Sequence, residues 1–172
     1  MIVQGFPPEK LHISSFNTVG TLLKPRHWSA AGVQHMLKSI GASGGTIYSS
    51  GVRVFHDHGV RIPSGADLVL FAVGDEAGED GRLFAQNLNQ FGYVPGAIAH
   101  IVNVARGSQR GNTVRRAAEE LAVPYTEVNV EQFTDVYQVQ RTLKAVLEAQ
   151  PFREKGSMIE KIMQTELLVS PY

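Results

Sequence analysis

The strongest constraint on the fold is a continuous apolar run at residues 67–73 (DLVLFAV), which leads into a loop rich in glycine and acidic residues. A strand that is apolar at nearly every position is typical of a parallel sheet covered on both faces. Residues 97–104 (AIAHIVNV) repeat this pattern, and residues 124–130 (PYTEVNV) alternate enough to predict a strand near a sheet edge. His100, inside the second run, is expected to be a hydrogen-bonded interior residue.

Segments with helical spacing separate these three strands. The spacing predicts helices over residues 82–89, 112–121 and 137–150. Strands that alternate with helices in this way form parallel sheets with right-handed crossovers. The expected fold class is therefore α/β, a mostly parallel, Rossmann-like sheet with helices on both faces. The loops that follow the strands are expected to lie together on one rim, where open α/β sheets bind ligands.

The first third of the chain is less regular. Residues 11–16 have strand character, and residues 18–23 either extend that strand or pair back on it as a hairpin. Residues 28–40 have helical spacing. Residues 47–58 fit a helix interrupted by Gly51 or a short strand. We favour the helix, because it returns the chain to the start of the next strand.

The chain of 172 residues has the size of one domain. We expect a lead-in at residues 1–10, one α/β domain at residues 11–150 and a tail at residues 151–172, in which residues 157–168 form a short amphipathic helix. The N-terminus does not have the pattern of a signal peptide. No apolar run approaches the roughly 18 residues that span a bilayer. We therefore expect a soluble, cytoplasmic protein that does not contact membranes.

Composition narrows the chemistry further. The chain has no cysteine, which excludes disulfides, thiolate zinc sites and a cysteine nucleophile. Its 16 basic and 16 acidic side chains cancel. This balance argues against a protein whose whole surface binds nucleic acid or anionic membrane, and it leaves a local basic patch open.

Two polar residues at the predicted rim are candidates for metal binding. Thr46 follows Gly44 and Gly45, and Asp75 follows the first buried strand after one glycine. A hydroxyl and a carboxylate are suitable ligands for a hard divalent cation such as Mg²⁺. In the alternative interpretation, the two glycines form a turn and Asp75 caps the next helix. Further acids in the same loop are either extra ligands or charges that favour the start of that helix. They are Glu76, Glu79 and Asp80.

A second candidate site lies at residues 107–116, where a glycine-containing loop leads into a helix with basic side chains. Free N–H groups at a helix start can hold a phosphate. The side chains expected to take part are Ser108, Arg110, Asn112, Thr113 and Arg115. In the alternative interpretation, Asn112 or Thr113 is an ordinary N-cap. The segment contains neither a Walker loop nor a GxGxxG motif.

The order of these elements resembles a von Willebrand factor A domain, particularly the type at the C-terminus of Ro (TROVE) RNA-binding proteins. The resemblance is carried by a strand ending in Ser15-Phe16-Asn17-Thr18, a helix, Gly44-Gly45-Thr46 and a second helix. The strand DLVLFAVGDEAG and two further strand–helix units then follow in the same order. The resemblance covers roughly residues 11–150.

Domains of this family bind a divalent cation through a DxSxS loop after the first strand, a threonine and a later aspartate. The resemblance implies that Thr46 and Asp75 match the last two ligands. No DxSxS occurs in the 172 residues, so the chain is similar to such a domain without its first strand–helix unit. We therefore expect Mg²⁺ or another divalent cation to bind weakly or not at all. Because the missing strand is central in the family's sheet, an N-terminal segment, a second copy or a protein partner is expected to complete the sheet.

Three functions are compatible with these residues. The favoured one is a non-catalytic binding module that makes protein–protein contact through the rim. The resemblance also implies a place in a Ro-type ribonucleoprotein, in which RNA is contacted only indirectly. The alternative is a nucleotide- or phosphate-binding α/β enzyme that uses Asp75 and residues 107–116. The third is a structural domain without a ligand.

Overall fold

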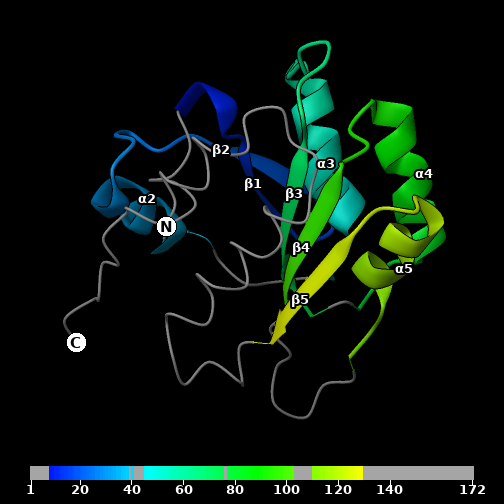
Figure 1. The fold of residues 1–172 in the computed structure, drawn as a ribbon. Helices are drawn as coiled ribbons and strands as arrows, with labels where there is room; N and C mark the ends of the chain where they lie inside the picture. Colours follow the sequence, from blue (N-terminus) through cyan, green and yellow to red (C-terminus); the bar gives the residue numbers. More distant parts are fainter. Residues whose placement is uncertain (1–7, 39, 41–44, 76, 103–109, 130–172) are drawn as a thin grey trace.

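The parallel sheet predicted from the apolar runs is present in the structure, a computed structural model that describes residues 8–38, 40, 45–75, 77–102 and 110–129 (Figure 1). Its strands lie in the order β3-β4-β5. They span Val69–Gly74 (β3), Ala97–Val102 (β4) and Tyr125–Asn129 (β5). Both pairings are parallel. Together with the helices, the sheet makes the chain a mixed α/β structure.

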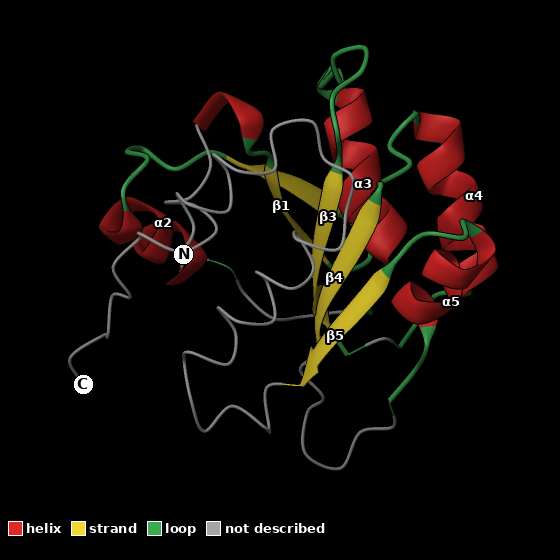
Figure 2. Cartoon of the chain, viewed as in Figure 1, coloured by secondary structure: helices red, strands yellow, loops and turns green. Residues whose placement is uncertain are grey.

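Three helices lie on one face of this sheet (Figure 2). They are α3 (Tyr48–Asp57), α4 (Gly81–Phe91) and α5 (Thr113–Glu120). α4 joins β3 to β4 and packs against both other helices. The ambiguous segment at residues 47–58 is thus a helix, as we favoured.

A separate antiparallel hairpin packs on α3. It consists of β1 (Ile13–Phe16) and β2 (Gly20–Leu23), which confirms the hairpin alternative. A side chain at Gly51 would collide with the ring of Phe16. The glycine that seemed to interrupt the helix therefore lets the hairpin approach it closely. A short 3-10 helix, η1 (Pro8–Lys10), precedes the hairpin, and α2 (Ala30–Lys38) follows it.

The hydrophobic core lies between β4 and the helices. Phe84, Leu88, Ile98, Val114 and Ala117 are each at most 1% exposed. Burying a large apolar side chain of this kind contributes roughly 1.5–3 kcal/mol. The register pairs Leu70 with Ile98 and Ile98 with Tyr125. One row of side chains across all three strands therefore faces the helical layer.

The structure corrects one expectation about β3. We expected a strand covered on both faces, but only Ala72 of its residues is buried and Val73 is 55% exposed. β3 lies at an edge of the described sheet, whereas five of the six residues of the central β4 are buried. β5 lies at the other edge of the described sheet, as its alternating pattern predicted.

Other expectations fall outside the described residues. The helices predicted at residues 137–150 and 157–168 lie outside the described residues. The prediction that helices cover both faces of the sheet is therefore untested. None of the helices in the described part is long and apolar enough to cross a membrane.

Candidate functional site

Three segments meet at the rim where β3 ends. The carbonyl oxygen of Asp75 accepts a hydrogen bond from the N–H of Gly111, at 3.4 Å. Gly78, with φ +93°, lies so close to the backbone of Thr46 that a side chain there would collide with it. The structure therefore brings the Thr46 segment, the loop after β3 and the loop before α5 together.

The acidic side chains of this rim hold the backbone in place. Oδ1 of Asp75 accepts a hydrogen bond from the N–H of Ala77, at 3.2 Å. Oε2 of Glu79 accepts one from the N–H of Ser49, at 2.9 Å, and so satisfies a donor in the first turn of α3. These acids fold the loop and fasten it to the neighbouring helix.

Asp80 is the N-cap of α4, which corrects the interpretation that Asp75 caps this helix. Oδ1 of Asp80 accepts hydrogen bonds from the N–H groups of Arg82, at 2.8 Å, and Leu83, at 3.2 Å. The cap lies five residues beyond Asp75. Between them, the loop passes Thr46 at Gly78 before the helix begins.

The rim supplies few ligands for a metal ion. Thr46 and Asp75 offer one hydroxyl and one carboxylate, whereas Mg²⁺ takes about six oxygen ligands. No group of three or more histidine, cysteine, aspartate or glutamate side chains suited to a metal is found among the described residues. With the described residues alone, a cation at this rim would keep several water ligands.

The arginines of the predicted phosphate site both bind a carboxylate. Arg110 and Arg115 both donate hydrogen bonds to Oε2 of Glu127 in β5. The bond from Arg115 is 2.6 Å long. Asn112 holds the N-cap position of α5 without a side-chain hydrogen bond, and Thr113 donates its hydroxyl to the carbonyl of Glu79. A phosphate at this place has to compete with Glu127. Ser108 lies outside the described residues.

A buried polar chain runs beneath the helices and ends at the same carboxylate. His100 is fully buried in β4, which confirms that it is a hydrogen-bonded interior residue. Its Nε2 lies 3.2 Å from the hydroxyl of Tyr48, and its Nδ1 lies 3.2 Å from the hydroxyl of Tyr125. Tyr125 then donates to Oε2 of Glu127, at 3.1 Å. The chain thus crosses from α3 through β4 to β5.

The donors of this chain point in one direction. Tyr125 has one hydroxyl proton, which goes to Glu127 because an ionised carboxylate only accepts. Tyr125 therefore accepts a hydrogen bond from Nδ1–H of His100. In the tautomer that carries its proton on Nδ1, Nε2 accepts from the hydroxyl of Tyr48. In that tautomer, each hydrogen bond donates toward Glu127.

The end of the chain is strongly ionic. Burial raises the pKa of Glu127, but hydrogen bonds from Arg110, Arg115 and Tyr125 outweigh burial and lower this pKa from 4.5 to about 2. The hydrogen bond to Glu127 raises the pKa of Arg115 in turn. The guanidinium carbon of Arg115 also lies 6.0 Å from the ring centroid of Tyr125.

The sequence contains part of the signal for this chain. Tyr125 and Glu127 are two apart in a strand and so share a face, and Glu127 pairs with His100 across the sheet. The alternating pattern of β5 predicts the shared face. Tyr48 has no such signal, because it is 52 residues from His100 and belongs to a helix.

Comparison with known proteins gives no relative. No protein-family model, no curated protein and no solved structure matches the chain. The resemblance to von Willebrand factor A domains therefore stays a prediction, and function has to be argued from the residues themselves.

Proposed function

We propose that the chain is a non-catalytic binding module that contacts a protein partner through the rim where β3 ends. The observation that carries the proposal is the convergence of the Thr46, Asp75 and Gly111 segments on that rim. Loops on a rigid sheet are common binding surfaces. The described acidic side chains of the rim accept hydrogen bonds from backbone N–H groups. This use of the carboxylates supports a binding role over acid–base catalysis.

Hydrogen exchange on the chain, free and bound to a co-purified partner, tests this proposal. We expect protection in peptides covering residues 45–50, 75–81 and 110–113. The control lies in the same molecule, because residues 58–66 and 92–96 lead into β3 and β4 at the opposite end of the sheet. Protection confined to that opposite end would contradict the proposal.

The rim is proposed to be an incomplete metal site. Adding Mg²⁺ or Mn²⁺ should therefore leave the melting temperature nearly unchanged, in the wild type and in Asp75→Ala alike. A ligand at 100 times its Kd would add about 2.7 kcal/mol to the free energy of unfolding. Stabilisation of this size in the wild type, absent from Asp75→Ala, would show that a functional cation site exists.

We also propose that a partner strand or a second copy completes the sheet. Within the described residues the hairpin and the parallel strands form separate sheets, and the ring of Tyr48 contacts both Phe16 and Gly74. Sedimentation of the purified chain distinguishes the two partners, because self-completion requires a concentration-dependent dimer. The place in a Ro-type ribonucleoprotein belongs to the same proposal and rests on resemblance alone.

A further inference from the structure

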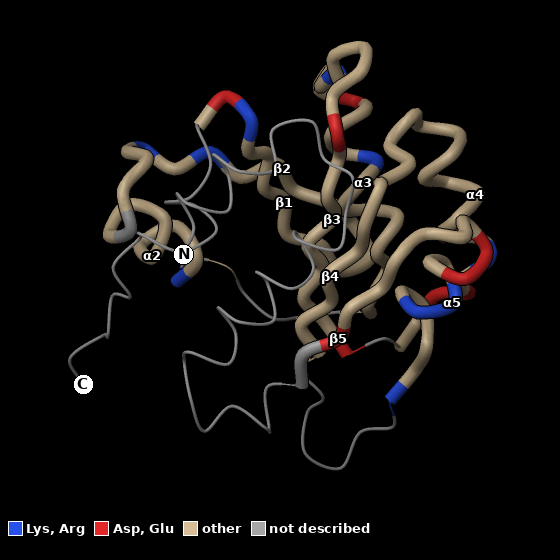
Figure 3. The backbone as a smooth tube through the Cα atoms, in the orientation of Figure 1, with Lys and Arg blue, Asp and Glu red and all other residues tan. Residues whose placement is uncertain are grey.

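The first third of the chain carries a net positive charge because acidic residues are scarce there. From Lys10 to His56 the sequence has five basic residues and four histidines but no acidic residue. Because the whole chain is neutral, this excess is balanced by acids elsewhere. Figure 3 shows basic positions around α2 and the loop before it, and acidic positions on α5 and β5. The neutral total therefore conceals a local basic surface.

A hollow of about 400 Å³ lies on this surface, between the exit of β2 and α2. Its lining consists of Lys24, Arg26, His27, Gly32, His35 and Met36. Ligand sites usually have volumes of about 300–1,000 Å³, so the hollow is large enough for one planar group and its charged neighbour. Among the described residues, neither Lys24 nor Arg26 forms an ion pair with an acidic side chain.

The loop that carries these charges is held firmly against α2. Oγ of Ser29 accepts a hydrogen bond from the N–H of Gly32, at 3.1 Å, and its carbonyl accepts one from Val33, at 3.0 Å. A side chain at Gly32 would collide with the carbonyl of His27. Pro25 is buried. The cationic side chains therefore project from a preorganised backbone, which lowers the entropic cost of binding.

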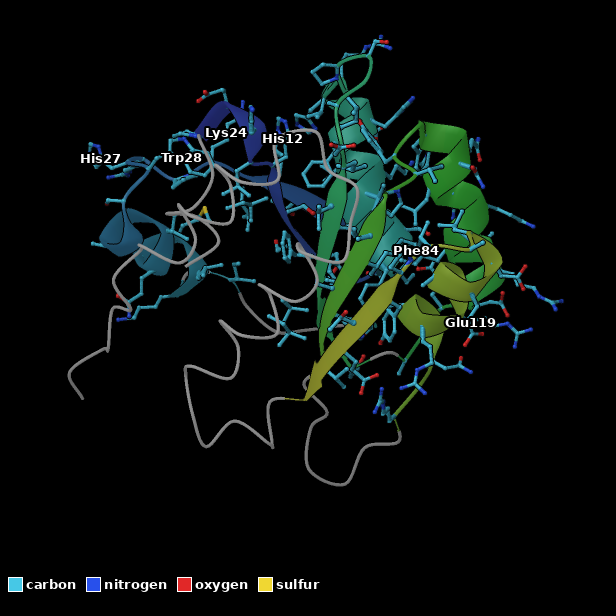
Figure 4. The ribbon with its side chains drawn as sticks, in the orientation of Figure 1. His12, Lys24, His27, Trp28, Phe84 and Glu119 are labelled. Carbon is cyan, nitrogen blue, oxygen red and sulfur yellow. The ribbon has the colours of Figure 1, made fainter. Side chains whose placement is uncertain are left out.

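Planar rings accompany the charges. Trp28 is the one tryptophan of the chain and is 39% exposed, next to the exposed His27. Figure 4 shows Lys24, His27 and Trp28 along the segment that joins β2 to α2. Single-stranded nucleic acid is bound by such combinations, in which cations follow the phosphates and aromatic faces stack on bases. We propose that this hollow and Trp28 bind single-stranded nucleic acid directly.

The observations favour this ligand over two others. An acidic peptide would pair with Lys24 and Arg26 but would leave the exposed ring of Trp28 without a role. An anionic bilayer requires a broad apolar face, whereas the large apolar residues exposed on α2 and beside it are Trp28, Leu37 and Ile40, each at most half exposed. The proposal also goes beyond the expectation from sequence that RNA is contacted only indirectly.

Fluorescence of Trp28 provides a direct test. The full chain is titrated at about 50 mM salt with an oligouridylate of about 12 nucleotides, and we expect its emission to be quenched. In parallel, the anisotropy of a labelled oligouridylate measures affinity. Trp28→Ala is expected to weaken binding about tenfold or more, and Trp28→Phe is expected to retain most of it, because phenylalanine still stacks.

Two double variants that each remove two positive charges distinguish binding at this site from general electrostatic attraction of the nucleic acid. Lys24→Gln with Arg26→Gln is expected to reduce the slope of log K against log salt by about 1.4, since each phosphate contact on a single strand contributes about 0.7. The control, Arg61→Gln with Arg82→Gln, removes two exposed charges outside the segment from Lys10 to His56 and is expected to leave this slope nearly unchanged. Equal effects of the two pairs would overturn the proposal.

Two further probes complete the test. Heparin supplies anionic groups without bases, and vesicles of phosphatidylserine supply an anionic membrane. We expect both to bind more weakly than the oligouridylate and to be insensitive to Trp28→Ala. The proposal is overturned if the oligouridylate does not bind, if Trp28→Ala binds it as the wild type does, or if vesicles bind more tightly. Melting temperatures confirm that each variant is folded.

Discussion

At the scale of residues, the chain from Tyr48 to Glu127 shows how a buried histidine is accommodated. Leaving a buried polar group without a partner costs about 1–3 kcal/mol, whereas a satisfied hydrogen bond contributes about 0.5–1.5 kcal/mol. Both ring nitrogens of His100 have a tyrosine hydroxyl within 3.2 Å. The polar atoms of this interior histidine therefore have partners among the side chains of the fold.

The ionic end of the chain predicts a specific pH dependence. The pKa of Glu127 is lowered in the folded protein to about 2, so its stabilising contribution is full above about pH 4.5 and is lost as the pH falls toward 2. Because this side chain is 20% exposed, solvent screening limits the contribution to about 1–2 kcal/mol. Glu127→Gln should therefore destabilise the chain at pH 7 and show a weaker loss of stability in acid.

Glu119→Gln is the matched control for this prediction. Glu119 is an exposed glutamate near the end of α5 (Figure 4), and its replacement should change stability by less than about 0.5 kcal/mol. Urea unfolding of the three proteins from pH 7 to pH 3 gives the comparison. If both variants follow the wild-type pH profile, the ion pairs of Glu127 do not stabilise the fold.

At the scale of elements, the starts of α4 and α5 differ although both have a residue suited to capping. The side chain of Asp80 accepts two N–H groups of α4, while the side chain of Asn112 caps nothing at α5. Thr113, the first residue of α5, instead donates to the carbonyl of Glu79. α5 is thus held at its start by the rim loop.

This difference predicts unequal effects of two otherwise similar substitutions. Asp80→Ala should lower the free energy of unfolding by about 1 kcal/mol, because it leaves two helix donors unsatisfied. Asn112→Ala should lower it by less than about 0.5 kcal/mol. Thermal unfolding followed by circular dichroism measures both values. An equal loss in the two variants would show that Asp80 does not act as a cap.

The elements themselves could be predicted from sequence because their patterns are local. Continuous apolar runs and helical spacing located β3, β4, α4 and α5 to within a few residues. How deeply each strand is buried could not be predicted from these local patterns. β3 and β4 are similarly apolar, but β3 has one neighbouring strand in the described sheet and β4 has two; Val73 is exposed and Ala99 is buried.

At the scale of the whole molecule, Tyr48 is the side chain that joins the parts. Its ring centroid lies 4.8 Å from that of Phe16 in the hairpin and 5.7 Å from that of Phe84 in α4. Its hydroxyl reaches His100 and lies directly over Gly74 of β3. Tyr48 thus connects the hairpin, two helices and two strands.

The close approach of Tyr48 makes Gly74 hard to replace. A methyl group at Gly74 would overlap the tyrosine hydroxyl, which cannot move without breaking its bond to His100. We expect Gly74→Ala to destabilise the chain by about 1–3 kcal/mol. Gly96→Ala is the control, because the nearest atom to a methyl group there is 3.8 Å away. Chemical denaturation checks both, and equal stability of the two variants would contradict the packing described.

The candidate sites were predictable to different degrees. The order of strands and loops placed Asp75 at the rim, because the ends of parallel strands meet there, and the resemblance to A-type domains suggested Thr46 as its neighbour. The partners of Arg110 and Arg115 were not visible, because Glu127 reaches them only through the pairing of β5 with β4. The neutral total charge neither predicted nor excluded the basic hollow, because a total carries no information about where the charges lie.

The direction of the polar chain also has a consequence for how this sequence can change over evolutionary time. Replacing one member by an apolar residue removes a hydrogen-bond partner from its neighbour and costs stability. Replacing both partners together can leave stability nearly unchanged. His100, Tyr125 and Tyr48 are therefore expected to be inherited as a set. In an alignment of descendants, we expect substitutions at His100 to be accompanied by substitutions at the tyrosines that contact it.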